Sequence, residues 1–309
     1  MRSTSNRLLY AVTVLIWGST WIAIKFQLGE VAPEVSIFYR LVLASTALMA
    51  FVGIRSLSLR FSWRAHFFIA LQGVLLFSVN YYLVYLASLY LPSGLAAVTF
   101  SLVTVMNNFF GALFLGNPIR PRVLLGAVIG LAGLTLVFWP EFSSLDLSNN
   151  MALGLGLSLA SVVITSLGNI TSARNQRHDI PVVQANALGM AYGAVFMLGV
   201  TVLNGSPFNF EWSVGYVGSM LFLSLLGSAV AFGTYLTLLG RIGPDRAAYV
   251  VVLFPIVALA ISTAFEDFVW TPLALAGVAL VLVGNAIVLT KIGTIRPRLA
   301  ASASASEAP

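Results

Sequence analysis

Ten stretches of about twenty predominantly apolar residues follow one another along this chain, and the segments between them are short. An α-helix needs about twenty apolar residues to cross the hydrocarbon core of a bilayer. In lipid every backbone polar group must be satisfied within the fold, so such stretches form helices. We therefore predict an all-α integral membrane protein with ten transmembrane helices. The predicted spans are residues 8–27, 33–54, 66–90, 94–115, 121–139, 152–173, 181–203, 214–239, 245–265 and 271–291.

The distribution of charge predicts the orientation of these spans. Charged residues make up only 8% of the chain, and all sixteen Lys and Arg except Lys25 and Arg40 fall on one side when the spans alternate. Lys and Arg in short loops collect on the cytoplasmic side, so we expect both termini to be cytoplasmic. The net charge of +6 reflects this bias and the attraction of the chain to the lipid surface. We predict no nucleic-acid partner.

The two halves of the chain resemble each other. Residues 91–98 are similar to residues 242–250, and Pro92 matches Pro244. Three further positions agree in spacing to within one residue, namely Pro121, Gly126 and Gly133 in the first half and Pro272, Gly277 and Gly284 in the second. Spans one to five therefore recur as spans six to ten. Because five is odd, the second half starts from the opposite side of the membrane, so the repeats are inverted.

This repeat predicts three segments: a first five-helix repeat at 1–141, a second at 142–299, and a disordered Ala/Ser-rich tail at 300–309. Inverted repeats are a transporter architecture, with a substrate site near the midplane between the halves. Duplication without a transport role is the alternative. Gly126 and Gly130 form a small-residue face that we expect to pack against span ten; dimerisation through this face is the alternative.

Three features resemble a known family: the first-span run Trp17-Gly18-Ser19-Thr20-Trp21, the Phe38-Tyr39-Arg40 that follows Pro33, and the repeated Pro–Ala turn. They are similar to the EamA-domain branch of the drug/metabolite transporter superfamily over about residues 8–291. The resemblance implies an exporter of small metabolites in the bacterial inner membrane, with a cavity between the halves. The aromatic content of the spans is similar to the branch that exports aromatic and other amino acids.

The chain departs from this family at two places. Members often carry proline in the spans after the repeated turn, and Pro255 fits this pattern whereas Val103 stands in the first half. A glutamate is usual after span four, where Asn117 stands here. Substrate and gating details of the family are therefore not transferred freely to this chain. The alternative cargoes are lipophilic cations or drugs and nucleotide-related metabolites.

Polar and aromatic side chains at mid-depth are the candidate substrate-binding residues. Trp17, Trp21 and Lys25 are four residues apart and share one helical face. Polar groups in hydrocarbon tend to face a bundle interior or a cavity, although they can also join helices. The remaining candidates are Asn80, Tyr81, Tyr82, Tyr85, Thr99, Val103, Asn107, Ser166, Asn169, Tyr235 and Tyr249. Helix packing is the alternative for the tyrosines and asparagines.

Lys25, Arg40 and Pro255 are the candidate gating residues. Lys25 is interpreted as a lysine that snorkels near the outer end of span one, or else as a partner for a substrate carboxylate. Arg40 either snorkels to the outer surface or pairs with an outer glutamate such as Glu34. Pro255 removes one backbone hydrogen bond in span nine and is expected to kink it near Val251.

Several kinds of chemistry lack the residues they need. No Asp or Glu falls inside a predicted span core, and His66 and His178 lie at the inner ends, so we expect no midplane proton relay. The chain has no cysteine, no phosphate-binding Gly-Lys loop and no metal-spaced cluster. We therefore predict a non-enzymatic carrier without cofactor or metal, whose partners are a small-molecule substrate and the bilayer, with no evident obligate protein partner.

Overall fold

The computed structural model describes residues 2–117, 121–137, 139, 150–231, 234–235 and 250–289. Every regular element within these residues is a helix. The helices are α1 (Arg2–Lys25), α2 (Pro33–Ile54), α3 (Trp63–Gly73), η1 (Val74–Val79), α4 (Asn80–Ser88), α5 (Ser93–Phe100), α6 (Val103–Leu115), α7 (Pro121–Val137), α9 (Asn150–Arg177), α10 (Val182–Leu203), α11 (Val214–Leu221), η2 (Phe222–Val230), α14 (Val250–Phe265) and α15 (Pro272–Leu289). The all-helical prediction is confirmed for this part of the chain.

The ends of these helices follow local sequence signals. Proline is the first residue of α2, α7 and α15, where its fixed φ suits a helix start and its missing N–H costs nothing. The hydroxyl oxygens of Ser62 and Ser213 accept hydrogen bonds from backbone N–H groups in the first turns of α3 and α11. Gly116, at φ 68°, closes α6 in the left-handed conformation.

Six of the described helical segments are long and apolar enough to cross a membrane, and four shorter apolar helices accompany them. The six are Asn6–Lys25, Pro33–Ile54, Trp63–Ser88, Ser93–Leu115, Asn150–Arg177 and Val182–Leu203; the four are Pro121–Val137, Val214–Val230, Leu253–Phe265 and Pro272–Ile287. Together these segments follow the order of the ten predicted spans. Because four of them are short, the prediction that the chain crosses the membrane ten times stays a prediction. Residues 232–233 and 236–239 of span eight and residues 245–249 of span nine lie outside the described residues.

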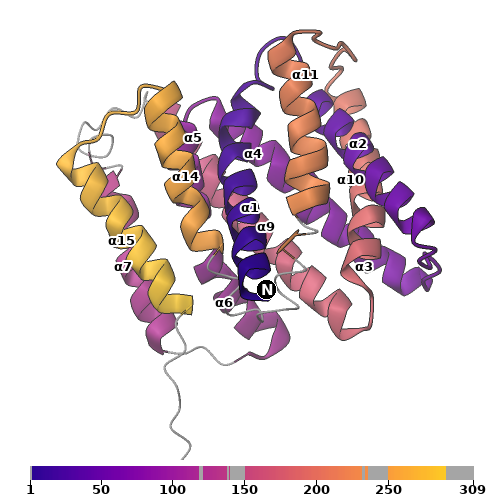
Figure 1. Ribbon diagram of the computed structural model, residues 1–309, viewed down its shortest axis with the longest axis horizontal. Helices are drawn as coiled ribbons and strands as arrows, with labels where there is room; N and C mark the ends of the chain where they lie inside the picture. Colours follow the sequence, from indigo (N-terminus) through magenta and orange to yellow (C-terminus); the bar gives the residue numbers. More distant parts are fainter. Residues whose placement is uncertain are drawn as a thin grey trace, which may run out of the picture.

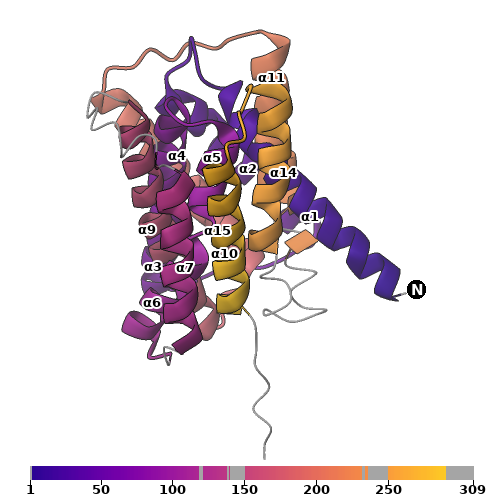
Figure 2. The ribbon, with the colours of Figure 1, turned by 90° about the vertical axis from the view of Figure 1, so that its left-hand side faces the viewer.

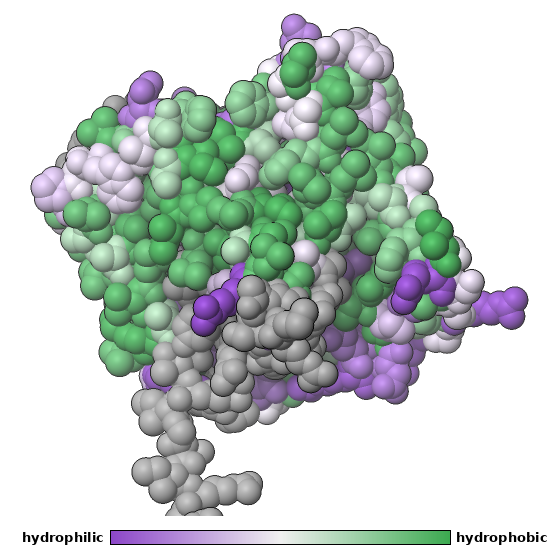
Figure 3. Space-filling view, in the orientation of Figure 1, coloured by the Kyte–Doolittle hydropathy of each residue, from purple (hydrophilic) through white to green (hydrophobic). Residues whose placement is uncertain are grey.

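The surface of the bundle suits contact with lipid. Large apolar side chains such as Leu124, Val128 and Val195 are more than half exposed along their helices. Figure 3 shows the result on one face: hydrophobic residues cover the middle of the molecule, and hydrophilic ones gather toward its upper and lower margins. This distribution is expected of a chain whose helices lie in hydrocarbon and whose loops reach water.

Two helix pairs flank the bundle. α7 packs along α15 at one side, and α2 packs along α10 at the opposite side, with α1, α4, α9 and α14 between them (Figure 1). A Cβ added at Gly133 would lie 2.5 Å from the carbonyl oxygen of Gly277, and one at Gly284 would lie 2.6 Å from that of Gly126. The predicted close packing of spans five and ten through glycine is therefore confirmed.

A buried polar cluster joins α3, α9 and α10. The Gln72 side-chain amide donates to Asn186 Oδ1 at 2.9 Å, and Asn175 Nδ2 donates to Gln72 Oε1 at 3.0 Å. All three residues are buried. Amide groups in a membrane protein join helices in this way because hydrocarbon offers them no other partner. These residues lie away from the cavity described below.

Candidate substrate-binding cavity

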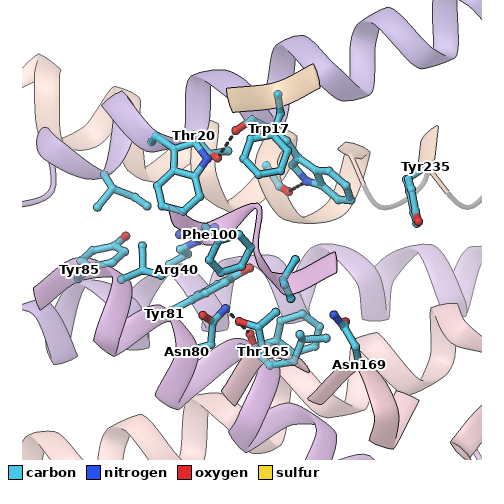
Figure 4. A pocket seen from close by; sticks show the side chains of 18 of the residues that line it. Trp17, Thr20, Arg40, Asn80, Tyr81, Tyr85, Phe100, Thr165, Asn169 and Tyr235 are labelled. Atoms are coloured by element: carbon cyan, nitrogen blue, oxygen red, sulfur yellow. Dashed lines mark hydrogen bonds between the residues drawn. The ribbon is translucent and has the colours of Figure 1, made fainter. Parts of the chain in front are cut away.

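A cavity of about 320 Å³ lies between the helices of the two halves of the chain (Figure 4). Its volume is at the lower end of the range of about 300–1,000 Å³ that small-molecule sites occupy. Among the described residues it is lined by Trp17, Thr20, Trp21, Ile24, Arg40, Leu76, Phe77, Asn80, Tyr81, Val84, Tyr85, Phe100, Val103, Asn107, Thr165, Asn169, Gly227, Tyr235 and Phe254. Arg40 is the one charged residue in this set.

The α1 wall of the cavity is aromatic. Trp17 Nε1 donates to the Gly227 carbonyl of η2 at 3.3 Å, and its ring lies 5.2 Å from that of Tyr235. One turn later, Trp21 meets Phe100 edge-on at 5.3 Å and stacks over Phe254 at 6.1 Å. Since these rings come from α1, α5 and α14, they give the cavity a flat apolar surface built by both halves.

The α4 wall combines aromatic rings with the buried cation. Arg40 of α2 is only 4% exposed, and its guanidinium carbon lies 4.0 Å from the centre of the Tyr81 ring. Tyr85, one turn after Tyr81, is fully buried beside the same guanidinium. Asn80 donates through Nδ2 to the Leu76 carbonyl at 3.1 Å, so its Oδ1 is left for another group. Figure 4 shows these side chains on one side of the cavity.

The wall opposite α1 is polar but uncharged. Asn169 of α9 donates through Nδ2 to Oδ1 of Asn107 on α6 at 3.3 Å. Thr165 lies one turn before Asn169 on the same face of α9. The two asparagines therefore join helices and line the cavity at once, so the two interpretations left open by the sequence are compatible here.

Nine of the predicted substrate-binding residues line the cavity: Trp17, Trp21, Asn80, Tyr81, Tyr85, Val103, Asn107, Asn169 and Tyr235. Three others lie elsewhere. The Thr99 hydroxyl donates to the Leu95 carbonyl of its own helix at 3.0 Å, and Tyr82 lies beside Glu34 and Asn204. Ser166 is buried but is rotated about 100° around α9 from Thr165, which takes the lining position. Tyr249 lies outside the described residues.

Sequence reasoning missed several lining residues. Thr20 and Thr165 had a usable signal, since each lies one turn from a predicted neighbour on the same helix face. Phe100 and Phe254 had none, because an apolar residue within an apolar span is equally compatible with lipid, packing or a cavity. Only the tertiary contact with Trp21 distinguishes them.

The interpretations of Arg40 and Lys25 need correction. Arg40 neither snorkels nor pairs with Glu34, whose carboxylate accepts instead from Asn204 at 3.1 Å and Ser206 at 2.6 Å. Lys25 is turned inward: its Nζ donates to the Ser88 carbonyl at 2.5 Å and lies 3.7 Å from Glu266 Oε1.

The Lys25–Glu266 pair lies at one end of the bundle, next to several helix ends. Glu266 also accepts from the backbone N–H of Ser93 at 2.8 Å and from the Ser93 hydroxyl. Through these contacts the end of α1 is joined to the end of α4, the start of α5 and the end of α14. Pro255 lies inside α14 next to the cavity-lining Phe254, and the kink expected there stays a prediction.

No group of three or more His, Cys, Asp or Glu side chains that could hold a metal ion occurs in the described ranges. The cavity therefore offers aromatic faces, amide and hydroxyl groups and one guanidinium. Such a set recognises a solute by shape, stacking and hydrogen bonds.

Comparison with known proteins agrees with this picture. The model of the EamA-like transporter family matches residues 6–139 and 152–290. The uncharacterized inner membrane transporter YedA of Escherichia coli is 28% identical over 276 residues, covering 87% of each chain. A probable amino-acid metabolite efflux pump of Escherichia coli is 24% identical over 291 residues, covering 91% of this chain and 94% of that protein.

A crystal structure with 18% sequence identity shares the fold, with a TM-score of 0.66 over 93% of this chain and 98% of that one. The two matches to the family model together cover most of the sequence. They agree with the apolar helices and with the surface that suits contact with lipid. The chain is a multi-pass membrane protein that belongs to the EamA-like transporter family.

Proposed function

We propose that this protein exports small metabolites, chiefly amino acids including aromatic ones, from the bacterial cytoplasm across the inner membrane. Two inverted five-helix repeats, residues 1–141 and 142–299, alternate access to the cavity between them. The observation that carries the proposal is the composition of the cavity wall, which takes residues from both halves and combines stacked rings with uncharged polar groups. A site between inverted repeats is where a carrier of this kind binds its cargo.

The helix contacts support the inverted repeat. If spans one to five are equivalent to spans six to ten, each contact between two spans should have a counterpart between the equivalent spans. The contact of α1 (span one) with α14 (span nine) has its counterpart in the contact of α9 (span six) with α5 and α6 (span four), and both contacts exist. Likewise, the contact of α3 with α10 has its counterpart in that of η2 with α2, and the contact of α4 with α9 in that of η2 with α1. The pairs α2–α10 and α7–α15 are their own counterparts. Such a pattern is expected when a two-fold axis relates the halves.

The two π-helices support it as well. η1 (Val74–Val79) and η2 (Phe222–Val230) occupy matching places in spans three and eight. In each, a serine hydroxyl donates to the carbonyl five residues earlier: Ser78 to Gly73 at 3.4 Å and Ser228 to Leu223 at 3.0 Å. Short π-helical turns within helices are rare and often occur at functional sites. We assign them as paired bending points of the two halves.

The cavity favours amino acids over the alternative cargoes. A lipophilic cation is attracted by carboxylates and aromatic faces and is repelled by another cation. The charge among the described lining residues is the positive one of Arg40. A nucleotide carries several phosphate charges, which one arginine balances poorly. A cavity of about 320 Å³ is also small for either cargo. The similarity to the probable amino-acid metabolite efflux pump of Escherichia coli agrees with amino-acid export.

The test is counterflow in liposomes that contain the purified protein, with a panel of labelled aromatic and aliphatic amino acids. We expect uptake of the aromatic members, and a decrease of about tenfold in the Trp17→Ala variant, which corresponds to the loss of about 1.4 kcal/mol of binding. Trp212→Ala is the matched control, because that tryptophan is 84% exposed in a loop. Uptake of no amino acid at all would remove the amino-acid assignment, and uptake of lipophilic cations instead would replace it.

A further inference from the structure

We propose that Arg40 binds the carboxylate of the substrate, so that the cavity selects solutes with an anionic group at one end and a flat apolar group at the other. This inference rests on the proposed transport function and specifies its substrate class. Arg40 lies on α2 about 10 Å along the helix axis from the first residue, at 1.5 Å per residue, and so well inside the span.

Arg40 is a buried charge that has no counter-ion among the described residues. A guanidinium stays protonated in proteins, and a cation inside a membrane protein normally has a charged or carbonyl partner. Among the described residues no carboxylate lies within ion-pair distance of Arg40. Glu34, the nearest acidic residue along α2, is occupied by Asn204 and Ser206. The Tyr81 ring face, 4.0 Å from the guanidinium carbon, compensates only part of the charge.

Unused hydrogen-bonding groups gather in the same cavity. Arg40 Nε, Asn80 Oδ1 and Thr165 Oγ1 are buried and lack a hydrogen-bond partner among the described residues. The Tyr85 hydroxyl is buried beside the Arg40 guanidinium, and no described group meets it with good hydrogen-bond geometry. All four residues line the cavity. Buried polar groups are normally satisfied, so several unsatisfied ones in one place indicate a missing ligand.

The chemistry of these groups matches a zwitterion. Arg40 Nε and the Tyr85 hydroxyl can donate to a carboxylate, and hydrogen bonds between a guanidinium and a carboxylate are among the strongest in proteins. Asn80 Oδ1 accepts only, and the Thr165 hydroxyl can accept, so these two suit an ammonium group. Trp21, stacked over Phe254, provides the apolar surface for the side chain. An amino acid presents all three features within the size of the cavity.

The experiment compares each amino acid with its amide, which keeps the side chain and the ammonium but lacks the carboxylate. Wild-type protein in liposomes is expected to exchange phenylalanine at least tenfold faster than phenylalaninamide, and leucine faster than leucinamide. Arg40→Gln should lower phenylalanine exchange at least tenfold and bring the acid-to-amide ratio close to one. Arg40→Lys should keep part of the selectivity, because the charge remains and the planar fork is lost.

Arg174→Gln is the matched control, since Arg174 also lies over an aromatic ring, 3.3 Å from the centre of Phe68, but outside this cavity. It should leave the acid-to-amide ratio unchanged. A thermal unfolding scan shows whether Arg40→Gln folds. If it does not fold, the inference is tested by the acid-to-amide ratio of Arg40→Lys and by that of the wild type. Equal exchange of phenylalanine and its amide by wild type, or an unchanged ratio in folded Arg40→Gln, would overturn the inference.

A binding measurement distinguishes failure of the proposed transport function from failure of the Arg40 assignment. If wild type exchanges neither amino acids nor amides, binding is measured by the stabilisation that phenylalanine, 3-phenylpropionate and phenylalaninamide give to the purified protein. Stabilisation by the two acids alone, lost in Arg40→Gln, would support a carboxylate site in a protein whose cargo is another acid. Equal stabilisation by acids and amide, or none by any of them, would remove the assignment of Arg40.

Discussion

Lys25 and Glu266 form the ion pair that joins four helix ends at one end of the bundle, and we predict that they hold the outer end closed. Their side chains are 27% and 14% exposed, so we take the pair to stabilise this conformation by about 1 kcal/mol, the upper end of the range for exposed pairs. Glu266→Gln should then raise access from the outer face about fivefold. The chain has no cysteine, so Thr20→Cys in the cavity reports access through its rate of labelling by a membrane-impermeant thiol reagent.

Glu211→Gln is the control for this measurement. Glu211 is another carboxylate of the same end, and the hydrogen bond described for its side chain is with Ser213, two residues away. It should leave the labelling rate of Thr20→Cys unchanged. Identical rates in the Glu266→Gln and Glu211→Gln backgrounds would show that the ion pair does not control access.

For individual residues, the sequence predicted polar and aromatic cavity-lining residues better than apolar ones. The four-residue spacing of Trp17 and Trp21 identified a shared face, and both side chains line the cavity. The interpretation of Arg40 was wrong because its position near an outer loop suggested that its side chain reaches water. In the structure α2 packs against α4 and α10, and the Arg40 side chain is buried. Phe100 and Phe254 could not be found, since their role arises only from the fold.

The helices α7 and α15 are in close backbone contact through glycine. We predict that Gly133→Ala lowers stability by about 1–3 kcal/mol, the usual cost of overpacking. The added methyl would lie 2.5 Å from the Gly277 carbonyl oxygen and 2.8 Å from Leu280 Cβ, so the backbone must shift. The change is measured as the midpoint of thermal unfolding in detergent.

Gly199→Ala on α10 is the matched control, because a Cβ at Gly199 would meet no atom within 4 Å. It should be neutral or raise the midpoint, since alanine stabilises a helix relative to glycine by about 0.5–1 kcal/mol. Equal midpoints for Gly133→Ala and Gly199→Ala would mean that α7 and α15 separate without cost, and the small-residue face would then serve another contact.

Helix positions were predictable from apolar length, but their internal irregularities were not. α2 spans Pro33–Ile54, as predicted, since proline and polar residues bound it. The interruption at Ser101–Leu102 between α5 and α6 has no proline or glycine to announce it. The Ser101 hydroxyl instead accepts from Asn285 Nδ2 of α15 at 2.8 Å. Such a break depends on contacts from the far end of the chain, which no local pattern contains.

Across the whole molecule, charge separates the two ends of the bundle. Because successive helices alternate in direction (Figure 2), one end carries Arg55 and Arg60 in a loop and Arg64 in the first turn of α3. The loops at the other end carry Glu30, Glu211 and Asp267. This distribution agrees with the orientation predicted from the sequence and would direct export from the arginine-rich side. A negatively charged substrate group approaching from that side meets a favourable potential before it reaches Arg40.

We predict that transport by this protein is not coupled to protons. None of the described cavity-lining residues is Asp, Glu or His, and such groups are the usual proton carriers within a membrane. We expect downhill exchange of amino acids in liposomes at equal pH on both sides, with no accumulation when a gradient is imposed. One coupled proton would concentrate a zwitterion about tenfold per pH unit, since a unit corresponds to about 1.4 kcal/mol. Such accumulation, abolished by Glu34→Gln, would instead identify the buried Glu34 as a proton carrier reached through water.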